Sequence, residues 1–315
     1  MTNILITGSS GQIGSELIDY LLASYDGQII ATDIKKVENF KADGRVKFET
    51  LDIRDWTKLY GLIDQYQISE IYHLASILSA SGEKDPFLAY NVNLTGTVNV
   101  LNASVAKKID KLFIPSSIAV YGPEAEKNNA GTRHSSIPTT MYGITKLSAE
   151  MLCQYYNRKY DLDVRSIRFP GVISSKVSPT AGTTDFSVEM IKSAVGGKNY
   201  TCYLKKETSL PMVYMEDAMR STLRLMATPR DSIKIRTSYN IMGYSMTCEE
   251  LEDEIRKTYP EFKVNYVPDY RQKIADTWPQ SVDVSDAKRD WNFSANFNLE
   301  KTVNEMIHNL KLDMN

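Results

Sequence analysis

Residues 3–14 read "NILITGSSGQIG", an apolar run followed by three glycines. An apolar run of this kind is typical of a parallel strand that is covered on both faces. Gly8, Gly11 and Gly14 have the GxxGxxG spacing that allows a tight turn, a close approach of pyrophosphate to the backbone, and close helix–strand packing. The N–H groups at the start of the following helix would face the phosphate charge. The stretch predicts a dinucleotide-binding unit, although such glycine triplets also occur in plain turns.

Acidic residues end the next two expected strands. Asp33 comes about twenty residues after the glycine loop, where a carboxylate accepts hydrogen bonds from the adenosine ribose and repels a 2′-phosphate. This favours NAD over NADP, although Lys35 and Lys36 follow closely and could soften the preference. Asp52 is placed either to accept from the adenine amino group or to cap a strand end in solvent. Asp33 makes NAD the expected cofactor.

Apolar runs alternate with amphipathic stretches through the first half of the chain. The expected strands are 3–8, 28–33, 46–52, 70–76, 111–117 and 164–170. The expected helices between them are 12–24, 56–66, 87–107 and 142–160. This alternation predicts an α/β fold with a doubly wound parallel Rossmann sheet and right-handed crossovers.

The pattern changes after Pro170. Residues 171–183 are rich in Gly, Ser, Thr and Pro, and helical patterns follow at 185–197, 216–227, 248–258 and 299–311. We therefore expect an NAD-binding Rossmann domain over 1–170 and a smaller, interleaved C-terminal α/β lobe over 171–315 that binds substrate. The boundary is soft, and some segments of the lobe are expected to return to the main sheet.

Composition narrows the class of protein. The chain has 315 residues, 42% apolar and 24% charged, as is usual for a soluble protein with a core. Its net charge of −2 gives no sign of a nucleic-acid or anionic-membrane partner. Three scattered cysteines and three distant histidines predict no metal site and a reducing compartment. With no room for a signal peptide before the first strand and no bilayer-length apolar run, we expect a cytoplasmic protein.

A second motif suggests catalysis. Tyr142 and Lys146 in "YGITK" are four residues apart, which places them on one helix face. Ionising tyrosine near neutral pH requires its pKa to fall by roughly 3 units, about 4 kcal/mol, and a nearby ammonium or cationic nicotinamide acts in that direction. An isolated Tyr/Lys pair is usually an ordinary surface pair. "PSSIAVYG" (115–122) favours the catalytic interpretation, because Ser117 can donate a hydrogen bond to a substrate oxygen beside the tyrosine.

Taken in order, the motifs resemble those of the extended short-chain dehydrogenases/reductases over essentially the whole chain. They are GxxGxxG, Asp33, "HLA" (73–75), "NVNLTGTVNVL" (91–101), "SSIAVYG" (116–122) and YxxxK. The resemblance implies that Ser117 orients the hydroxyl, Tyr142 is the general acid/base, and Lys146 lowers the tyrosine pKa and holds the nicotinamide ribose. Asn93 matches the asparagine that orders the region of the fourth and fifth strands. The expected cofactor-binding residues are Gly8, Gly11, Gln12, Ile13, Gly14, Asp33, Asp52, Ile53, Leu74, Ala75, Tyr142, Lys146 and Pro170.

Five further segments resemble the short-chain type of L-threonine 3-dehydrogenase. They are "LASILSASGEKDP" (74–86), "RFPGVIS" (168–174), "AGTTDFS" (181–187), "LPMVYMEDA" (210–218) and "WPQSVDVSDAKRDW" (278–291). This type is metal-free, which agrees with the missing ligand cluster. Phe186 departs from it, because tyrosine is usual at that position. The resemblance implies NAD-dependent oxidation of L-threonine at C3 to 2-amino-3-oxobutyrate, with Tyr142 as base and hydride transfer to nicotinamide.

Threonine is a small zwitterion, so its site needs donors for the carboxylate, an acceptor for the ammonium and a base for the hydroxyl. The expected substrate-binding residues are Ser79, Ser81, Ser117, Tyr142, Thr183, Thr184 and Asp185. The alternative for the first two is a flexible polar loop, and for Thr184 or Asp185 it is a helix N-cap. Trp278 could close the pocket or simply pack.

Other interpretations remain open from the residues. Helices 87–107 and 142–160 resemble a four-helix dimer interface, which predicts a homodimer or higher oligomer, or else they only pack on the sheet. A nucleotide-sugar epimerase or dehydratase on this scaffold would need basic residues for a diphosphate, and 171–200 has three lysines but no arginine. A non-catalytic NAD-sensing regulator would not need the complete Ser/Tyr/Lys set.

Overall fold

The computed structural model describes residues 2–36, 43–133, 137–176 and 182–312, and its centre is a six-stranded parallel sheet. The strand order is β3-β2-β1-β4-β5-β7. These strands are β1 (Asn3–Thr7), β2 (Ile29–Asp33), β3 (Val46–Thr50), β4 (Ile68–His73), β5 (Lys111–Phe113) and β7 (Val164–Arg165). Every pairing among them is parallel. The α/β fold expected from the sequence is confirmed.

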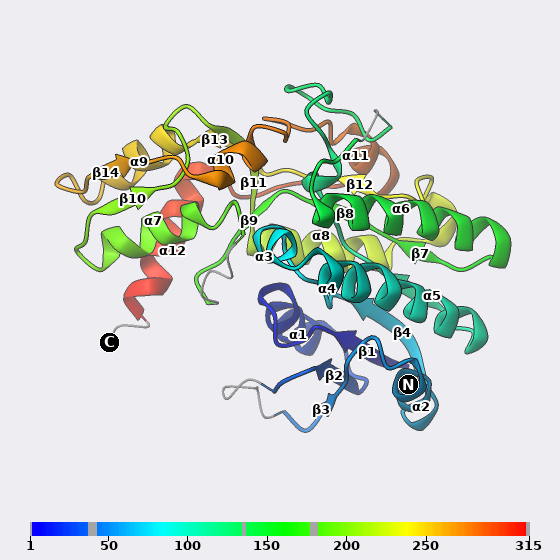
Figure 1. Ribbon diagram of the computed structural model, residues 1–315. Helices are drawn as coiled ribbons and strands as arrows, with labels where there is room; N and C mark the ends of the chain where they lie inside the picture. Colours follow the sequence, from blue (N-terminus) through cyan, green and yellow to red (C-terminus); the bar gives the residue numbers. More distant parts are fainter. Residues whose placement is uncertain (1, 37–42, 134–136, 177–181, 313–315) are drawn as a thin grey trace.

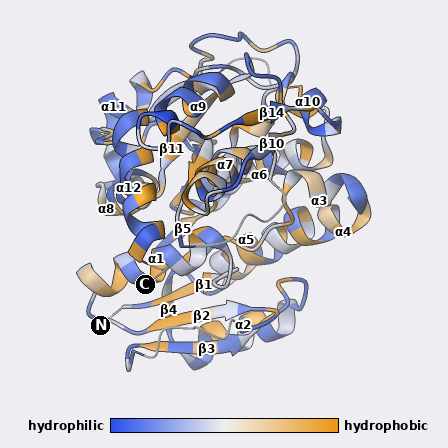
Figure 2. Ribbon diagram, turned by 90° about the vertical axis from the view of Figure 1, so that its left-hand side faces the viewer, coloured by the Kyte–Doolittle hydropathy of each residue, from blue (hydrophilic) through white to orange (hydrophobic). Residues whose placement is uncertain are grey.

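Helices cover both faces of this sheet. Ile4 and Ile6 of β1 pack with α1 and α8, whereas Leu5 between them packs with α2, α5 and α6. The bounds are α1 (Gln12–Ser24), α2 (Trp56–Gln65), α5 (Gly96–Ala106), α6 (Met141–Tyr160) and α8 (Met215–Ala227). Because successive strand residues point to opposite faces, an unbroken apolar strand serves both helix layers. Figure 2 shows the hydrophobic character of β1, β2 and β4.

The region after β4 differs from the sequence expectation. Ser79 and Ser81 lie in a short helix, α3 (Ser79–Lys84), and not in a flexible loop. The helix expected over 87–107 is divided into α4 (Pro86–Tyr90), a π-helical segment η1 (Asn91–Thr95) and α5. Asp85 caps the start of α4 by accepting from the backbone N–H of Leu88 (2.9 Å), and the backbone stays helical from α4 through η1 into α5, so the π-helical turn lies inside one continuous helical stretch. Single π-helical turns of this kind are frequent at functional sites.

The rest of the chain forms smaller sheets and a separate core. The sheets are β12-β8-β6, β13-β11-β9 and β10-β14. Their strands are β6 (Ser116–Ser117), β8 (Ile167–Phe169), β9 (Gly171–Ile173), β10 (Tyr200–Cys202), β11 (Ser209–Tyr214), β12 (Tyr239–Asn240), β13 (Tyr244–Thr247) and β14 (Val264–Tyr266). The helices are α7 (Phe186–Val195), α9 (Cys248–Arg256), α10 (Tyr270–Ala275), α11 (Ser285–Trp291) and α12 (Leu299–Leu312), with 3₁₀ turns η2 (Ile118–Val120) and η3 (Arg230–Ser232). Helices α10 and α11 are not predicted from the sequence.

These later elements do not all gather in one place. Figure 1 shows α7, α9, α12, β10 and β14 together at one end of the molecule, while β12 and α11 return beside β8. The chain returns to the first half of the fold at β12, because β12 and β6 both pair in parallel with β8. Segments before and after Pro170 therefore share one sheet. The division into domains at residue 170 stays a prediction.

A buried ion pair joins three of these elements. The Arg168 guanidinium of β8 donates to both carboxylate oxygens of Glu150 on α6, at 2.8 and 2.7 Å, and both side chains are almost fully buried. Its remaining donors reach the Tyr121 hydroxyl and the Thr132 carbonyl, each at 3.0 Å. The Glu150 carboxylate also accepts from the Ser116 hydroxyl of β6. Charges buried in this way are tolerated only when they are paired and fully hydrogen-bonded.

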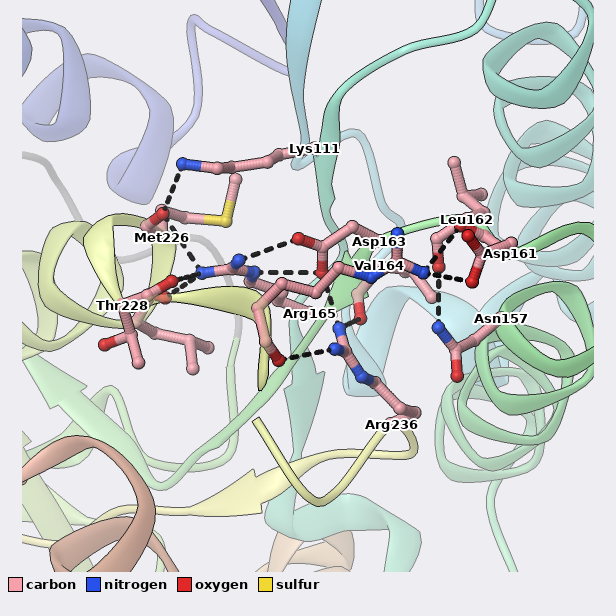
Figure 3. Close-up of polar contacts among 12 residues, drawn as sticks. Lys111, Asn157, Asp161, Leu162, Asp163, Val164, Arg165, Met226, Thr228 and Arg236 are labelled. Carbon is pink, nitrogen blue, oxygen red and sulfur yellow. Dashed lines mark hydrogen bonds and ion pairs between the residues drawn. The ribbon is translucent and has the colours of Figure 1, made fainter. Parts of the chain in front are cut away.

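A second buried arginine fixes the end of α8. Figure 3 shows Arg165 of β7 among the carbonyls at that end, and its Nη1 donates to the oxygens of Leu225 (2.6 Å), Met226 (3.1 Å) and Thr228 (2.6 Å). The Asp163 carboxylate holds the same guanidinium at 3.1 and 2.7 Å. A cation bonded to the last carbonyls of a helix satisfies them and favours the dipole. Arg165 thereby anchors α8 to the main sheet.

The described part of the chain was compared with the features of membrane proteins, metalloproteins and disulfide-bonded proteins. There, no helix is long and apolar enough to cross a bilayer. No group of three or more His, Cys, Asp or Glu side chains in those residues has a metal-binding arrangement. Cys153, Cys202 and Cys248 are all buried and free.

Glu150→Gln keeps the size of this buried side chain but removes its charge. We expect it to lower the free energy of unfolding by about 3 kcal/mol, because the Arg168 charge is then buried without a counter-ion. Urea denaturation measures the change. Asp64→Asn is the control, since the Asp64–Lys107 pair is largely exposed and should cost less than about 1 kcal/mol. Equal losses in the two variants would contradict the role given to the buried pair.

Candidate active site

The glycine loop after β1 is shaped by close backbone approaches. Gly8 has a φ of +70°, and a Cβ there would lie 2.5 Å from the backbone nitrogen of Ala75. A Cβ on Gly14 would lie 2.4 Å from the carbonyl oxygen of Gly8. Helix α1 then begins without a side-chain cap, so N–H groups of its first turn are available to an anion. Glycines that no other residue can replace, together with an uncapped helix start, fit a dinucleotide phosphate.

The two strand-end carboxylates have different surroundings. Asp33 accepts hydrogen bonds from the backbone N–H groups of Ser10 (3.0 Å) and Ile34 (2.7 Å), which hold it beside the glycine loop. Asp52 is bound through both oxygens by the Arg54 guanidinium, and this pairing lowers the pKa of its carboxyl. The fixed position of Asp33 fits the ribose of NAD. The role of Asp52 toward adenine stays a prediction.

Most of the predicted site residues meet in one cavity of about 390 Å³, called here the cofactor cavity. Those that line it are Gly8, Gly11, Gln12, Ile13, Gly14, Leu74, Ser79, Ser81, Ser117, Tyr142, Lys146, Pro170, Thr183, Thr184 and Asp185. Asp33, Asp52, Ile53 and Ala75 are not among its lining residues. Residues that sequence reasoning did not assign also line it, among them Ser76, Ile77, Leu78, Pro115, Phe169 and Gly171. All six lie within sequence motifs quoted above, and this position in the motifs could have identified them as site residues.

The Ser/Tyr/Lys group is assembled from β6 and the first turns of α6. Thr140 caps α6 by accepting from the N–H of Gly143 (3.1 Å), which fixes where the helix begins. Tyr142 and Lys146 follow one turn apart, and the Lys146 ammonium lies 5.6 Å from the centre of the Tyr142 ring. That ammonium donates to the Pro115 carbonyl oxygen at 3.1 Å, next to β6 and Ser117. The predicted shared helix face is therefore present.

Burial dominates the proton affinities of this group. It raises the pKa of Tyr142 to about 12, and the hydrogen bond with Ser117 lowers it only in part. Burial also lowers the pKa of Lys146 to about 8. The sequence suggested a tyrosine pKa below its ordinary value. In the chain by itself the direction is the opposite, because removing the phenolate from water costs more than the nearby serine hydroxyl returns.

Two buried polar side chains hold the surrounding loops. Asn93, in η1, accepts from the N–H of Ile77 (2.7 Å) and donates to the Ile77 carbonyl (3.0 Å) and the Thr145 hydroxyl (3.2 Å). It thereby ties the loop after β4 to the catalytic helix. His73 contacts the hydroxyls of Thr7 (2.8 Å) and Thr97 (3.2 Å), and burial lowers its pKa to about 3, so it is neutral.

A cluster of hydroxyls forms the wall opposite the glycine loop. The Ser79 and Thr183 hydroxyls are 3.4 Å apart, and both residues are buried. Asp185 occupies the N-cap position of α7, as the alternative expected, but its carboxylate accepts from the N–H of Gly182 (2.8 Å) and makes no capping bond to the helix. Trp278 is buried and lines the cavity. Residues 177–181, which include the first residue of the "AGTTDFS" motif, lie outside the described residues.

Phe186 also borders this region as the first residue of α7. Its ring is fully buried and packs edge-on against Tyr203, with the ring centres 6.5 Å apart. A phenylalanine satisfies this apolar environment without needing a hydrogen-bond partner. The missing hydroxyl, noted from the sequence, is thus accommodated by packing.

Comparisons with known proteins agree with this geometry. A family model described as "NAD dependent epimerase/dehydratase family" matches residues 4–241. An uncharacterized epimerase/dehydratase of Staphylococcus saprophyticus is 38% identical over 98% of this chain and 96% of its own length. A monomeric L-threonine 3-dehydrogenase from a metagenome is 45% identical, with a TM-score of 0.95 over 99% of this chain and 100% of that one. The GalE-like L-threonine dehydrogenase of Cupriavidus necator, in its holo form, is 40% identical, with a TM-score of 0.94 over 98% and 99%.

Gly14→Ala tests the dinucleotide loop. The added methyl group would overlap the Gly8 carbonyl, so the loop must shift and NADH affinity should fall by about tenfold or more. NADH fluorescence titration measures the dissociation constant. Gly61→Ala in α2 is the matched control, because its Cβ would meet no atom within 4 Å. NADH binding as tight in Gly14→Ala as in the control would count against the assignment.

Proposed function

Because the chain belongs to the NAD dependent epimerase/dehydratase family, and NAD is therefore its cofactor, we propose that it oxidises L-threonine at C3 to 2-amino-3-oxobutyrate. One observation supports this most: a single cavity joins the glycine loop, the Ser/Tyr/Lys group and the Ser79–Thr183 hydroxyl cluster. The L-threonine dehydrogenases of the comparison add support, since they match nearly the whole chain.

Tyr142 is the proposed base. The C3 hydroxyl of threonine would lie between the Ser117 hydroxyl, which donates to it, and the Tyr142 phenolate, which takes its proton as the C–O bond becomes a carbonyl. When bound, NAD supplies the acceptor for the hydride that leaves C3, and its nicotinamide ring carries positive charge. Lys146 is mostly an ammonium near neutral pH, since its pKa is about 8. Positive charge beside the ring opposes the effect of burial and favours the phenolate.

The hydroxyl cluster is the proposed amino-acid subsite. Ser79, Ser81 and Thr183 offer donors suited to the substrate carboxylate, and Asp185 is the carboxylate that lines the cavity and suits the ammonium. A site built from buried hydroxyls rejects apolar analogues, because they would leave these groups unpaired. The hydroxyls make this part of the cavity wall polar, which suits a small polar substrate. This favours an amino acid over a nucleotide sugar.

We also propose that the chain forms a homodimer through α4 and α6. These helices expose Phe87 (78% of its surface), Tyr90 and Tyr155. Large apolar side chains gathered on one surface are typical of protein interfaces. One solved relative is named as monomeric. Analytical ultracentrifugation measures the oligomeric state of this chain, and we expect the mass of a dimer.

Threonine turnover is the first test of the proposed function. NADH formation at 340 nm is expected with NAD and L-threonine, and much less with L-serine or D-threonine, because neither presents the same hydroxyl and methyl arrangement to Tyr142. The same assay with UDP-glucose in place of threonine tests the epimerase alternative. Conversion of the nucleotide sugar without threonine turnover would overturn the proposal.

Tyr142→Phe tests the assigned base. Loss of the hydroxyl should reduce kcat by about 10²- to 10⁴-fold, the usual contribution of a general base. NADH affinity, measured by fluorescence, should change little, because the ring that packs in the cavity remains. Tyr160→Phe, at the exposed end of the same helix, is the matched control. Substantial activity in Tyr142→Phe would remove that residue from the role of base.

Thr183→Ala tests the amino-acid subsite. Loss of one buried donor should raise the KM for threonine by about tenfold, while the KM for NAD changes by less than about twofold. Steady-state kinetics at saturating levels of the other reactant separate the two constants. Thr201→Ala, on the exposed side of β10, is the control. Equal increases in both KM values would give Thr183 a structural role only.

A further inference from the structure

A second cavity of about 620 Å³ lies against a different face of α6 from the one that carries Tyr142 and Lys146. Its walls come from α6, from Arg168 of β8, and from the segments 132–133 and 234–237. It shares no lining residue with the cofactor cavity. We call it the basic cavity, because five of its lining residues are cations: Arg133, Arg158, Arg168, Lys234 and Arg236.

Two of these cations are neutralised by the protein. Arg168 is paired with Glu150 in the core. Arg236 is turned toward Asp163, which it shares with Arg165, as Figure 3 shows. Both pairs hold the inner wall of the basic cavity in place, and their charges are balanced by the partner carboxylates.

Within the part of the chain that the structure describes, the other three cations have no counter-ion. Among the described residues, Arg133 and Arg158 make no side-chain ion pair, and the Lys234 ammonium bonds only to a backbone oxygen, that of Asp231 (2.6 Å). No aspartate or glutamate of the described ranges lines the basic cavity. Three cations gathered without a carboxylate, in a chain whose net charge is −2, create a local field that attracts anions.

The chemistry of the wall indicates the kind of anion. Guanidinium groups present paired N–H donors that match phosphate oxygens, and Lys234 adds a compact point charge. Thr132, Gln154 and Thr237 contribute neutral hydrogen-bonding groups to the same wall. We propose that the basic cavity binds a small phosphate-bearing anion, with its phosphate held by Arg133, Arg158 and Lys234. Its volume is within the range of small-molecule sites, and three cations suit a multiply charged phosphate better than one carboxylate.

Calorimetric titration of the full chain with inorganic tripolyphosphate tests this proposal. NADH is kept saturating so that the cofactor cavity is filled. We expect saturable binding at one site per chain that weakens as salt is raised, because the contacts are electrostatic. Acetate serves as the carboxylate probe and should bind far more weakly. Absence of saturable tripolyphosphate binding, or acetate binding as tightly, would overturn the proposal.

Variants then locate the site. Arg158→Gln combined with Lys234→Gln should weaken tripolyphosphate by about tenfold or more, since each removes a charged donor. Arg168 is left intact because its loss would leave Glu150 unpaired in the core. Arg224→Gln, an exposed arginine on α8 outside both cavities, is the matched control and should bind as the unmodified chain does. Thermal unfolding and NADH affinity confirm that the variants are folded. Equal weakening in the control and the double variant would place binding elsewhere.

Discussion

The Arg168–Glu150 ion pair is the contact on which the rest of this structure depends most. It bridges β8 and α6, and the Ser116 hydroxyl on the same carboxylate brings in β6. The strand that carries Ser117 and the helix that carries Tyr142 are thereby held in one register. A buried pair of this kind adds little net stability compared with apolar packing, but its geometry is demanding. Its value here lies in fixing the relative position of β6 and α6, which carry the proposed catalytic residues.

The two faces of α6 differ in burial, because the side chains toward the cofactor cavity are desolvated and Arg158 toward the basic cavity is exposed. Toward the cofactor cavity burial raises the pKa of Tyr142 to about 12 and lowers that of Lys146 to about 8, so the group is poised for a positive partner. Toward the basic cavity Arg158 is exposed, and no acidic side chain lies beside it among the described residues of the wall. The same helix thus presents the desolvated Tyr142 and Lys146 side chains on one face and an exposed cationic side chain on another.

The local parts of the site were predictable because each rests on short-range rules. The glycine spacing at Gly8 and Gly14, the strand-end position of Asp33 and the four-residue step from Tyr142 to Lys146 all follow from backbone geometry within one or two elements. A prediction of local structure was wrong where the conformation depends on packing with distant segments. Ser79 and Thr183 were both expected at the substrate site, and their hydroxyls do meet although 104 positions separate them, but Ser79 begins a helix where a loop was expected.

The sequence by itself therefore determined the alternation of strands and helices, the dinucleotide loop and the order of the catalytic motifs. These features depend on hydrophobic periodicity and on conformations that few residue types can adopt. Only the tertiary structure decided that the Ser79 and Thr183 hydroxyls lie 3.4 Å apart, that burial raises rather than lowers the Tyr142 pKa, and that Arg133, Arg158 and Lys234 line one cavity. The physical reason is that desolvation and through-space charge depend on which segments pack together, and that is not written in the spacing of residues along the chain.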